Sequence, residues 1–148
     1  MARVPNQTSS QIPRYENCLL VSRHQLLPSQ QADLEKICEK ISKTDMLPTD
    51  TNDLKKFVEP YNAVIGVVPL VFQVQLLQWK KAVVLFYMEA IGTVGSKAEA
   101  EQLLTKSGLE GVILPPAKEG EPYRVSVYKG LLMVKEIKIV DEFIIKHG

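Results

Sequence analysis

Polar side chains with the chemistry of nucleotide recognition follow the apolar run at residues 18–21. A hydroxyl, a fixed cation, an imidazole and an amide come in order from Ser22, Arg23, His24 and Gln25. Such groups bind phosphodiesters and nucleobases. Loops that follow buried strands often bind ligands. This favours a ligand-binding role for residues 22–25 over the alternative of a solvated loop that only connects two elements. The helix expected next would add free backbone amides and the positive end of its dipole.

Two further segments also follow strand-like runs. We therefore expect them to lie near the first loop, at the edge of the predicted sheet where its strands end. Pro69 and Leu70 could wall an adenine-sized pocket, or could simply belong to the core and its turn. Residues 89–96 contain glycines, which allow close backbone approach, but the sequence there is neither G-x-G-x-x-G nor a P-loop. The candidate ligand-binding residues are Ser22, Arg23, His24, Gln25, Pro69, Leu70, Thr93, Gly95 and Ser96.

Continuous apolar runs alternate with amphipathic segments along the first two thirds of the chain. Strands buried on both faces are predicted at residues 18–21, 63–68 and 82–88, with a short edge strand around Met46 and Leu47. The first helix should start at a Ser29 cap and carry Leu34, Ile37, Cys38 and Ile41 on one face. Further helices are predicted over residues 51–58, 70–80 and 96–107, with caps at Asp50 or Thr51 and at Ser96.

The C-terminal part has a different pattern. Residues 123–127 and 131–139 alternate between apolar and polar side chains, and Lys129 with Gly130 between them predicts a hairpin turn. The whole pattern predicts a single Rossmann-like α/β domain, with a mainly parallel sheet, helices on both faces and a C-terminal antiparallel hairpin. Residues 1–16 lack periodicity and predict a disordered N-terminal arm, so that the ordered domain spans residues 17–148.

Composition narrows the class of protein further. The chain is 45% hydrophobic and 24% charged with a net charge of +1, which excludes the broad basic face of a protein that coats duplex nucleic acid. Cys18 and Cys38 fall at apolar positions and are predicted to be buried small hydrophobes rather than a disulfide or metal pair. No signal core or bilayer-length apolar run is present, so we expect a cytoplasmic protein without a membrane partner. No cluster of His and Cys residues has the spacing of zinc ligands, so we expect no metal, and we expect no other cofactor.

The first loop resembles a known family. Small stand-alone proteins of type III CRISPR systems, with a CRISPR-associated Rossmann (CARF-like) fold, often open with a strand that ends in Ser-His. A Leu-Thr pair and a Gln at the start of the first helix follow in that family. His24, Leu26 and Gln30 match this pattern without gaps, whereas Arg23 and Leu27 stand in place of the family's Ser and Thr.

A second similarity is the strand at residues 63–68, followed by Pro69 and an apolar helix. The resemblance implies binding of cyclic oligoadenylate, a messenger of CRISPR defence, with cyclic tetra-adenylate as the expected ring. It also implies either sequestration of the ring or slow, metal-independent cleavage, in which a ribose 2′-hydroxyl attacks the neighbouring phosphate. Arg23 would then hold the phosphate, and His24 would be the catalytic general acid or base if the protein is an enzyme.

Other functions stay open at this point: a non-enzymatic protein-interaction module, or a binder of another nucleotide metabolite. A homodimer is expected, because a ring of four nucleotides has approximate twofold symmetry and would meet equivalent residues from two copies. The apolar surface from Val68 through the third helix is the candidate dimer face. The alternative is that this helix is sandwiched in the core of the monomer.

Overall fold

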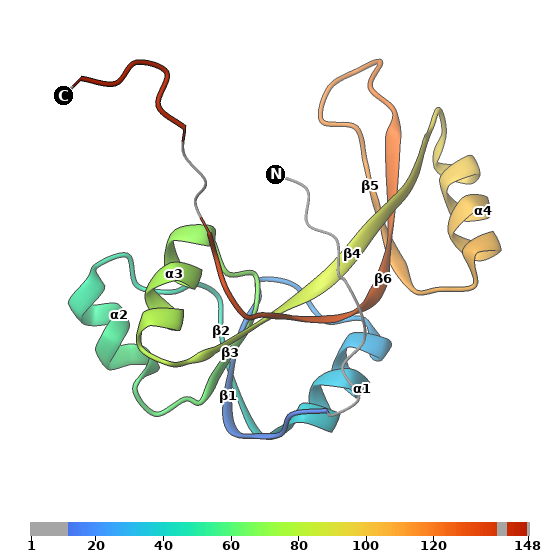
Figure 1. The fold of residues 1–148 in the computed structure, drawn as a ribbon. Helices are drawn as coiled ribbons and strands as arrows, with labels where there is room; N and C mark the ends of the chain where they lie inside the picture. The colour runs from blue at the N-terminus through green and yellow to red at the C-terminus, as the bar shows by residue number, and fades with distance from the viewer. Residues whose placement is uncertain (1–11, 139–141, 148) are drawn as a thin grey trace.

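Six strands form one mixed sheet in the computed structural model, which describes residues 12–138 and 142–147 (Figure 1). The strands are β1 (Tyr15–Val21), β2 (Cys38–Thr44), β3 (Ala63–Gly66), β4 (Ala82–Val94), β5 (Gly111–Leu114) and β6 (Tyr123–Val134). Their order across the sheet is β2–β1–β3–β4–β6–β5. The pairs β1–β2, β1–β3 and β3–β4 are parallel, whereas β6 is antiparallel to both β4 and β5.

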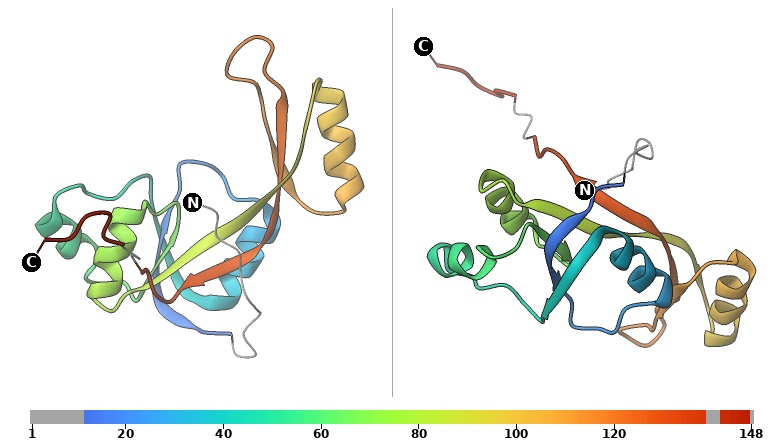
Figure 2. Two further views of the ribbon diagram at one scale, coloured as in Figure 1. Left: turned by 45° about the horizontal axis from the view of Figure 1, so that its top comes forward. Right: turned by 90° about the horizontal axis from the view of Figure 1, so that it is seen from below.

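Four helices lie within the described residues and cover the sheet unevenly. They are α1 (Pro28–Ile37), α2 (Thr51–Val58), α3 (Leu70–Gln78) and α4 (Lys97–Ser107). Helix α1 packs on one face of the parallel strands, and α2 and α3 pack on the other. Helix α4 lies at the far end of the molecule, and the long β4–β6 ribbon runs between it and α2 and α3 (Figure 2).

Alternate residues of the central strands point into two separate cores. Leu19 and Val21 of β1 belong to the core under α2 and α3, whereas Cys18 and Leu20 belong to the core under α1. Leu34 of α1 is fully buried in the second core. Each fully buried leucine of this kind stabilises the fold by roughly 1.5–3 kcal/mol. The mixed α/β class with helices on both faces, predicted from the apolar runs, is confirmed.

The predicted caps of α2 and α4 are confirmed. The Asp50 carboxylate accepts hydrogen bonds from the amides of Asn52 and Asp53, at 3.0 and 3.1 Å. The Ser96 hydroxyl accepts from the Glu99 amide at 3.2 Å, and α4 ends where Gly108 adopts a left-handed φ of 71°. These contacts involve residues within three positions of each other, so a local pattern was sufficient to predict them.

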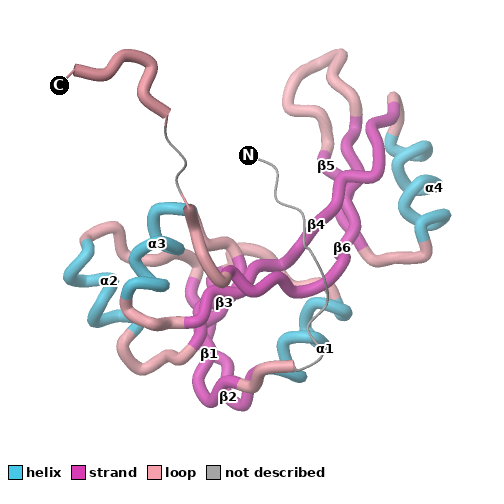
Figure 3. Tube along the Cα trace, viewed as in Figure 1, coloured by secondary structure: helices cyan, strands magenta, loops and turns pink. Residues whose placement is uncertain are grey.

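The predicted end of the fourth strand is wrong. Strand β4 continues past residue 88 to Val94, because β6 pairs with it from Val83 through Val94 and satisfies its backbone groups. Gly92, expected in a turn, lies inside the strand, where an added Cβ would meet the Leu103 side chain at 2.8 Å. Figure 3 shows β4 and β6 as long strands that continue from the central sheet to the region of α4.

The predicted C-terminal hairpin turn is also wrong. Lys129 and Gly130 lie within the single strand β6, where the register against β4 shifts and Gly130 has a φ of 140°. This irregularity is a bulge rather than a chain reversal. The Lys129 ammonium lies 3.8 Å from the Glu89 carboxylate of the neighbouring strand. The antiparallel hairpin is formed instead by β5 and β6, joined by the polar loop at residues 115–122.

Helix α1 is shorter than predicted, and the strand after it was missed. Leu27 rather than Ser29 is the N-cap, and β2 begins at Cys38 directly after the helix ends. Ile41 therefore lies on β2 and is 37% exposed. The edge strand is β2 itself, whereas Met46 and Leu47 lie in the following loop. Pairing of β2 with β1 supplies the backbone hydrogen bonds that a longer helix would have supplied.

Cys18 and Cys38 are buried, as expected, but they are joined by a disulfide, which corrects the prediction of two unpaired cysteines. Strand β1 begins at Tyr15, before the boundary expected at Asn17, and residues 1–11 of the predicted arm lie outside the described residues. Near the C-terminus, residues 142–147 are described and are not helical.

Candidate functional site

A pocket of about 320 Å³ lies where β1, β2 and β3 end. Its volume is at the lower end of the range for small-molecule sites, which is roughly 300–1,000 Å³. Three segments contribute to it: the loop after β1, the loop after β2, and the stretch from the end of β3 into α3. The lining residues are Val21, Ser22, Arg23, His24, Asp45, Met46, Leu47, Thr49, Val67, Pro69 and Phe72.

Backbone contacts hold these three segments together. The Ser22 amide donates to the Thr44 carbonyl at 3.0 Å, which joins the ends of β1 and β2. The Val67 amide donates to the Val21 carbonyl at 2.9 Å, which joins β3 to β1. Gly66 has a φ of 121° and lies directly against the backbone of Val21, where a side chain would overlap the carbonyl oxygen. The floor of the pocket is therefore built from rigid strand ends.

The Ser22 hydroxyl is engaged inside its own loop. Its Oγ donates to the His24 carbonyl at 2.9 Å and accepts from the His24 amide at 3.2 Å. Ser22 is also buried, so its structural role is to fix the turn that carries Arg23 and His24. The side chains of Arg23 and His24 are both exposed at the mouth of the pocket.

The charged groups of the pocket come from two loops. Arg23 follows β1, and Asp45 follows β2. In the part of the chain that the structure describes, Arg23 takes part in none of the ion pairs. Its guanidinium is available for a bidentate contact with a phosphate or carboxylate. One cation and one carboxylate among the lining residues suit a ligand with a single anionic group near Arg23 better than a run of phosphates.

The remaining walls are apolar. Val21 and Leu47 are buried at the base, Phe72 of α3 is partly buried, and Met46 and Val67 are exposed. An apolar base with a few polar groups at the mouth is the usual composition of a site for a flat organic ring. The arrangement can therefore hold an apolar ring in its base while Arg23 and His24 meet polar substituents.

The nine candidate residues from the sequence are not all in this pocket. It is lined by Ser22, Arg23, His24 and Pro69, whereas Gln25 and Leu70 are neighbours in sequence that do not line it. The last three, Thr93, Gly95 and Ser96, lie at the far end of β4 beside α4. There the Gly95 amide donates to the Glu99 carboxylate at 3.2 Å.

The Ser29 amide at the start of α1, one of those expected to be free for a ligand, already has a partner. Glu110, just before β5, accepts hydrogen bonds from the amide and the hydroxyl of Ser29, at 3.0 and 2.8 Å. The Leu27 amide donates to the Gln30 side chain at 2.9 Å. A carboxylate of the protein thus occupies the place at the helix N-terminus that a ligand phosphate would take.

Helix α1 is also fixed to β6 further along its length. The Tyr128 hydroxyl donates to the Asp33 carboxylate at 2.8 Å. Burial, and then this hydrogen bond and the charge of Asp33, raise the pKa of Tyr128 above its ordinary value, so the phenol stays protonated. The contact joins the helix that follows the pocket loop to the long ribbon.

Sequence reasoning missed the side of the pocket formed by the loop after β2. Asp45, Met46, Leu47 and Thr49 all lie in that loop. Cys38 and Ile41 were assigned to the end of the first helix, and the edge strand was instead placed on Met46 and Leu47. A strand assignment at residues 38–44 would have put this loop at the edge of the sheet where ligands bind.

Comparison of the chain with protein-family models, with curated proteins and with solved structures finds no match. Among the described residues, no helix is both long and apolar enough to span a membrane. The same residues contain no group of three or more His, Cys, Asp or Glu side chains placed to hold a metal ion. The pocket and the mixed α/β fold are thus the observations on which a function can be argued.

Proposed function

We propose that the chain is a Rossmann-like nucleotide-binding protein, and that its ligand is a cyclic oligoadenylate of CRISPR defence. The observation that carries the proposal is the pocket, where an apolar base for a nucleobase adjoins Arg23 and His24 for the sugar and phosphate. The resemblance of the first loop to CARF-like proteins selects cyclic oligoadenylate among nucleotides. In this proposal the protein acts in the cytoplasm.

The fold supports a Rossmann-like assignment through its first four strands. The order β2–β1–β3–β4 is parallel throughout, and each connection contains a helix. In open sheets of this kind, ligands bind outside the carboxyl ends of the strands, near the point where the order of the strands changes direction. That point lies between β1 and β3, whose final residues Val21 and Gly66 are paired at the pocket.

The size of the pocket supports a dimer as the binding unit. A volume of about 320 Å³ suits one nucleotide and leaves the rest of a ring outside. A second copy related by a twofold axis would offer an equivalent pocket and a second Arg23. A candidate contact surface is the apolar stripe of Val67, Leu70, Val71 and Val74, which are 68%, 54%, 61% and 39% exposed.

Val67 lies three residues before α3, and the other three members of the stripe lie on the outer side of α3, which carries no charged residue. The predicted dimer face was to begin at Val68, but Val68 is buried in the core. Leu76 and the partly buried Phe72 and Leu77 pack into the same core, so the helix has both an inner and an outer apolar side. Val67 belongs to the stripe and to the pocket, which makes the two surfaces continuous. The same stripe favours the alternative function, an interaction module that docks on another protein.

Sequestration is the form of the activity that the site supports best. Within the described residues, no side chain hydrogen bonds to the His24 imidazole, so nothing fixes it as a general base requires. If cleavage occurs, the 2′-hydroxyl forms a bond to the neighbouring phosphorus and the bond from phosphorus to O5′ breaks. The products carry a 2′,3′-cyclic phosphate and a 5′-hydroxyl, and the proton moves from O2′ to O5′.

Calorimetry and thermal melts with cyclic tetra-adenylate, linear tetra-adenylate, AMP and other mononucleotides test the proposal. We expect the ring to raise the melting temperature and to bind at one ring per two chains. If neither method detects binding at a saturating concentration of the ring, the proposed ligand is wrong. Binding of a mononucleotide alone would favour the metabolite alternative. A monomer in light scattering, with one ring per chain, would overturn the dimer.

Arginine variants locate the site. Arg23→Ala should weaken ring binding about ten- to a hundredfold, because a charge-assisted contact contributes roughly 1.5–3 kcal/mol. Arg124→Ala is the matched control, since Arg124 is also exposed but lies on β6 against the far end of β4. Lys129→Ala is a second control. Equal losses for the variants would show that the pocket is not the site.

Two further measurements separate cleavage from sequestration and identify the dimer face. Rings recovered intact after long incubation with excess protein establish sequestration, whereas cleavage that persists in EDTA and is lost in His24→Ala establishes catalysis. Val71→Lys should yield monomers if the stripe on α3 pairs two copies. Val112→Lys is the matched control, because Val112 on β5 is exposed to 39% and lies outside the stripe.

A further inference from the structure

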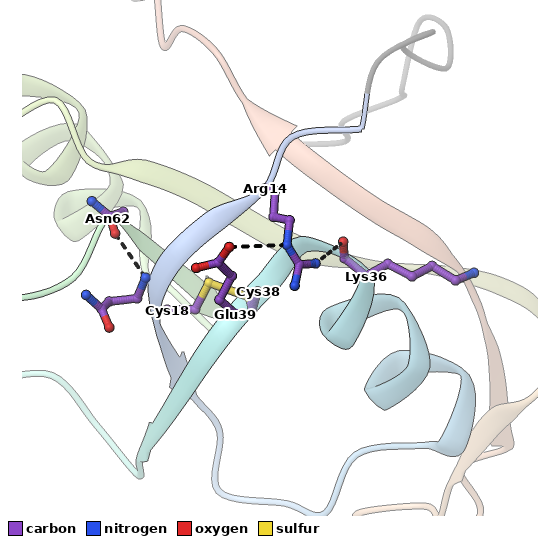
Figure 4. Close-up of polar contacts among 7 residues, drawn as sticks. Arg14, Cys18, Lys36, Cys38, Glu39 and Asn62 are labelled. Atoms are coloured by element: carbon purple, nitrogen blue, oxygen red, sulfur yellow. Dashed lines mark hydrogen bonds and ion pairs between the residues drawn. A yellow bond between two sulfur atoms is a disulfide. The ribbon is translucent and has the colours of Figure 1, made fainter.

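The disulfide between Cys18 and Cys38 closes the part of the chain that carries the pocket loop. Cys18 lies on β1, and Cys38 is the first residue of β2, with their Cα atoms 6.0 Å apart (Figure 4). The separation of 20 positions encloses the pocket residues Ser22, Arg23 and His24 together with all of α1. The bond therefore ties the two ends of one functional unit to each other.

Hydrogen bonds of Ser22, Ser29 and Asp33 restrain the loop and helix of this unit, but where the bond lies the main other restraint is the pairing of β2 with β1. Helix α1 passes directly into β2 without a loop, and β2 is an edge strand that pairs only with β1. The Arg14 guanidinium donates to the Lys36 carbonyl at 3.1 Å and lies 3.6 Å from the Glu39 carboxylate, as Figure 4 shows. Both side chains of that ion pair are about half exposed, so the pair adds little stability.

The position of β2 also determines how a reductant reaches the bond. Both cysteines are buried, at 1% and 4% exposure, so the closed sheet shields the sulfurs. All of Glu39 through Lys43 is exposed, and the outer edge of β2 has no neighbouring strand in the described sheet. Local opening of an edge strand takes less free energy than global unfolding, and it would uncover Cys38.

We propose that the Cys18–Cys38 pair is a redox switch for the pocket: the disulfide form holds the loop of Arg23 and His24 in its binding geometry, and the dithiol form releases it. Reduction by a dithiol transfers two electrons and two protons to the protein, breaks the S–S bond, and leaves two protein thiols and an oxidised disulfide reagent. In a reducing compartment, disulfides are usually transient or redox-sensing, which agrees with a regulatory role for a cytoplasmic protein.

The effect on the fold follows from the length of the closed loop. Removing a bond that closes about 20 residues should lower the melting temperature by roughly 6–12 °C. The amides of residues 22–27 should exchange hydrogen faster in the reduced protein, whereas those of the β4–β6 ribbon, which the bond does not enclose, should not change. The effect on ligand affinity rests on the proposed function, and the effects on melting and exchange do not.

The test begins with the redox state of the protein as purified. Thiol titration after denaturation without reductant should find no free thiol, and peptide mapping should find Cys18 linked to Cys38. Two free thiols after mild oxidation would overturn the bond and the proposal with it. Wild-type protein is then compared with and without dithiothreitol by thermal melting, by hydrogen exchange and by calorimetry with cyclic tetra-adenylate.

The double variant Cys18→Ala, Cys38→Ala is the matched control. It should melt and exchange as the reduced protein does, and it should not respond to dithiothreitol. If it fails to fold, the wild-type comparison alone decides. Reduction should weaken binding of the ring at least about tenfold.

The outcomes distinguish the two proposals. If both redox forms bind the ring equally well and exchange amide hydrogens equally fast, the redox-switch proposal is wrong and the proposed ligand is supported. Faster exchange of residues 22–27 after reduction, with no ring binding in either form, supports the switch and overturns the proposed ligand. Faster exchange together with weaker ring binding supports both.

Discussion

Gly66→Ala is the substitution that tests the geometry of the pocket most directly. Gly66 ends β3, pairs with Val21 of β1, and precedes Val67, which lines the pocket together with Val21. An alanine Cβ at this position would overlap the Val21 carbonyl oxygen and lie 3.2 and 3.4 Å from the carbonyl carbon and the amide nitrogen of Val21. These are backbone atoms of a buried strand, so they cannot rotate away as a flexible side chain would.

The expected loss of stability in Gly66→Ala is the sum of three destabilising terms, reduced by one smaller term that acts on the unfolded chain. Holding alanine at a φ of 121° costs roughly 1–3 kcal/mol. Separating the two strands adds roughly 1–3 kcal/mol of overpacking, and weakening the 2.9 Å bond from the Val67 amide to the Val21 carbonyl adds about 1 kcal/mol. The lower entropy of the unfolded chain offsets roughly 0.4–1 kcal/mol. A net loss of roughly 2–7 kcal/mol is expected, and even its lower end corresponds to roughly 4–8 °C in melting temperature.

Urea denaturation measures this loss, with circular dichroism and the fluorescence of the single tryptophan, Trp79, as probes. Trp79 is partly buried against the core under α2 and α3, so its signal reports that core. Gly95→Ala is the matched control, because no atom lies within 4 Å of an added Cβ there, and its expected change is within about 0.5 kcal/mol. If Gly66→Ala is as stable as Gly95→Ala, the close approach of β1 and β3 at the pocket is wrong.

Three other substitutions test local features. Lys80 follows Trp79, the C-cap of α3, and has a φ of 60°, so Lys80→Gly should stabilise the protein by roughly 0.5–1 kcal/mol in the same denaturation assay, and a loss would contradict the turn geometry. Asp50→Ala should cost about 1 kcal/mol through loss of the α2 cap, whereas Asp50→Asn should retain most of the stability. Glu110→Ala should lower the melting temperature by removing two hydrogen bonds to Ser29, with Glu119→Ala, an exposed loop variant, unchanged.

The parts of the fold that the sequence predicts correctly are those set by neighbouring residues. The caps at Asp50 and Ser96 and the αL residue Gly108 need only a few positions to act, and they are found where the patterns indicate. The apolar run at residues 63–68 correctly predicts a strand buried on both faces, although the strand ends at Gly66 rather than Val68. In each case the local preference and the tertiary environment agree.

The parts that the sequence does not predict depend on pairing between distant residues. Gly92 and Gly130 both carry the local signals of turns, yet both lie inside long strands because β4 and β6 satisfy each other's backbone groups. Cys38 and Ile41 continue the helical spacing of α1, but pairing with β1 makes them part of β2. The disulfide follows from that same pairing, since it brings the start of β2 beside Cys18.

The candidate site was half predicted for the same reason. The rule that ligands bind at the carboxyl ends of parallel strands correctly directs attention to the loop with Arg23 and His24, which does line the pocket. It fails for Thr93 because it was applied to a strand whose end had been misplaced. It misses Asp45 because the strand before that residue had been assigned to a helix.

The length of β4 decides which strands can supply polar groups to a ligand. Ile65 of β3 pairs with Val84, so β4 passes the level of the pocket at about Leu85. Thr93 is eight residues further along, or about 26 Å at the rise of an extended strand. Leu85 and the next residue are apolar and partly buried, and no residue of β4 is among those that line the pocket, so β4 supplies no charge to a ligand there. The cation for a phosphate must therefore come from Arg23, once per chain, which is why a ligand with several equivalent phosphates requires a second copy of the protein.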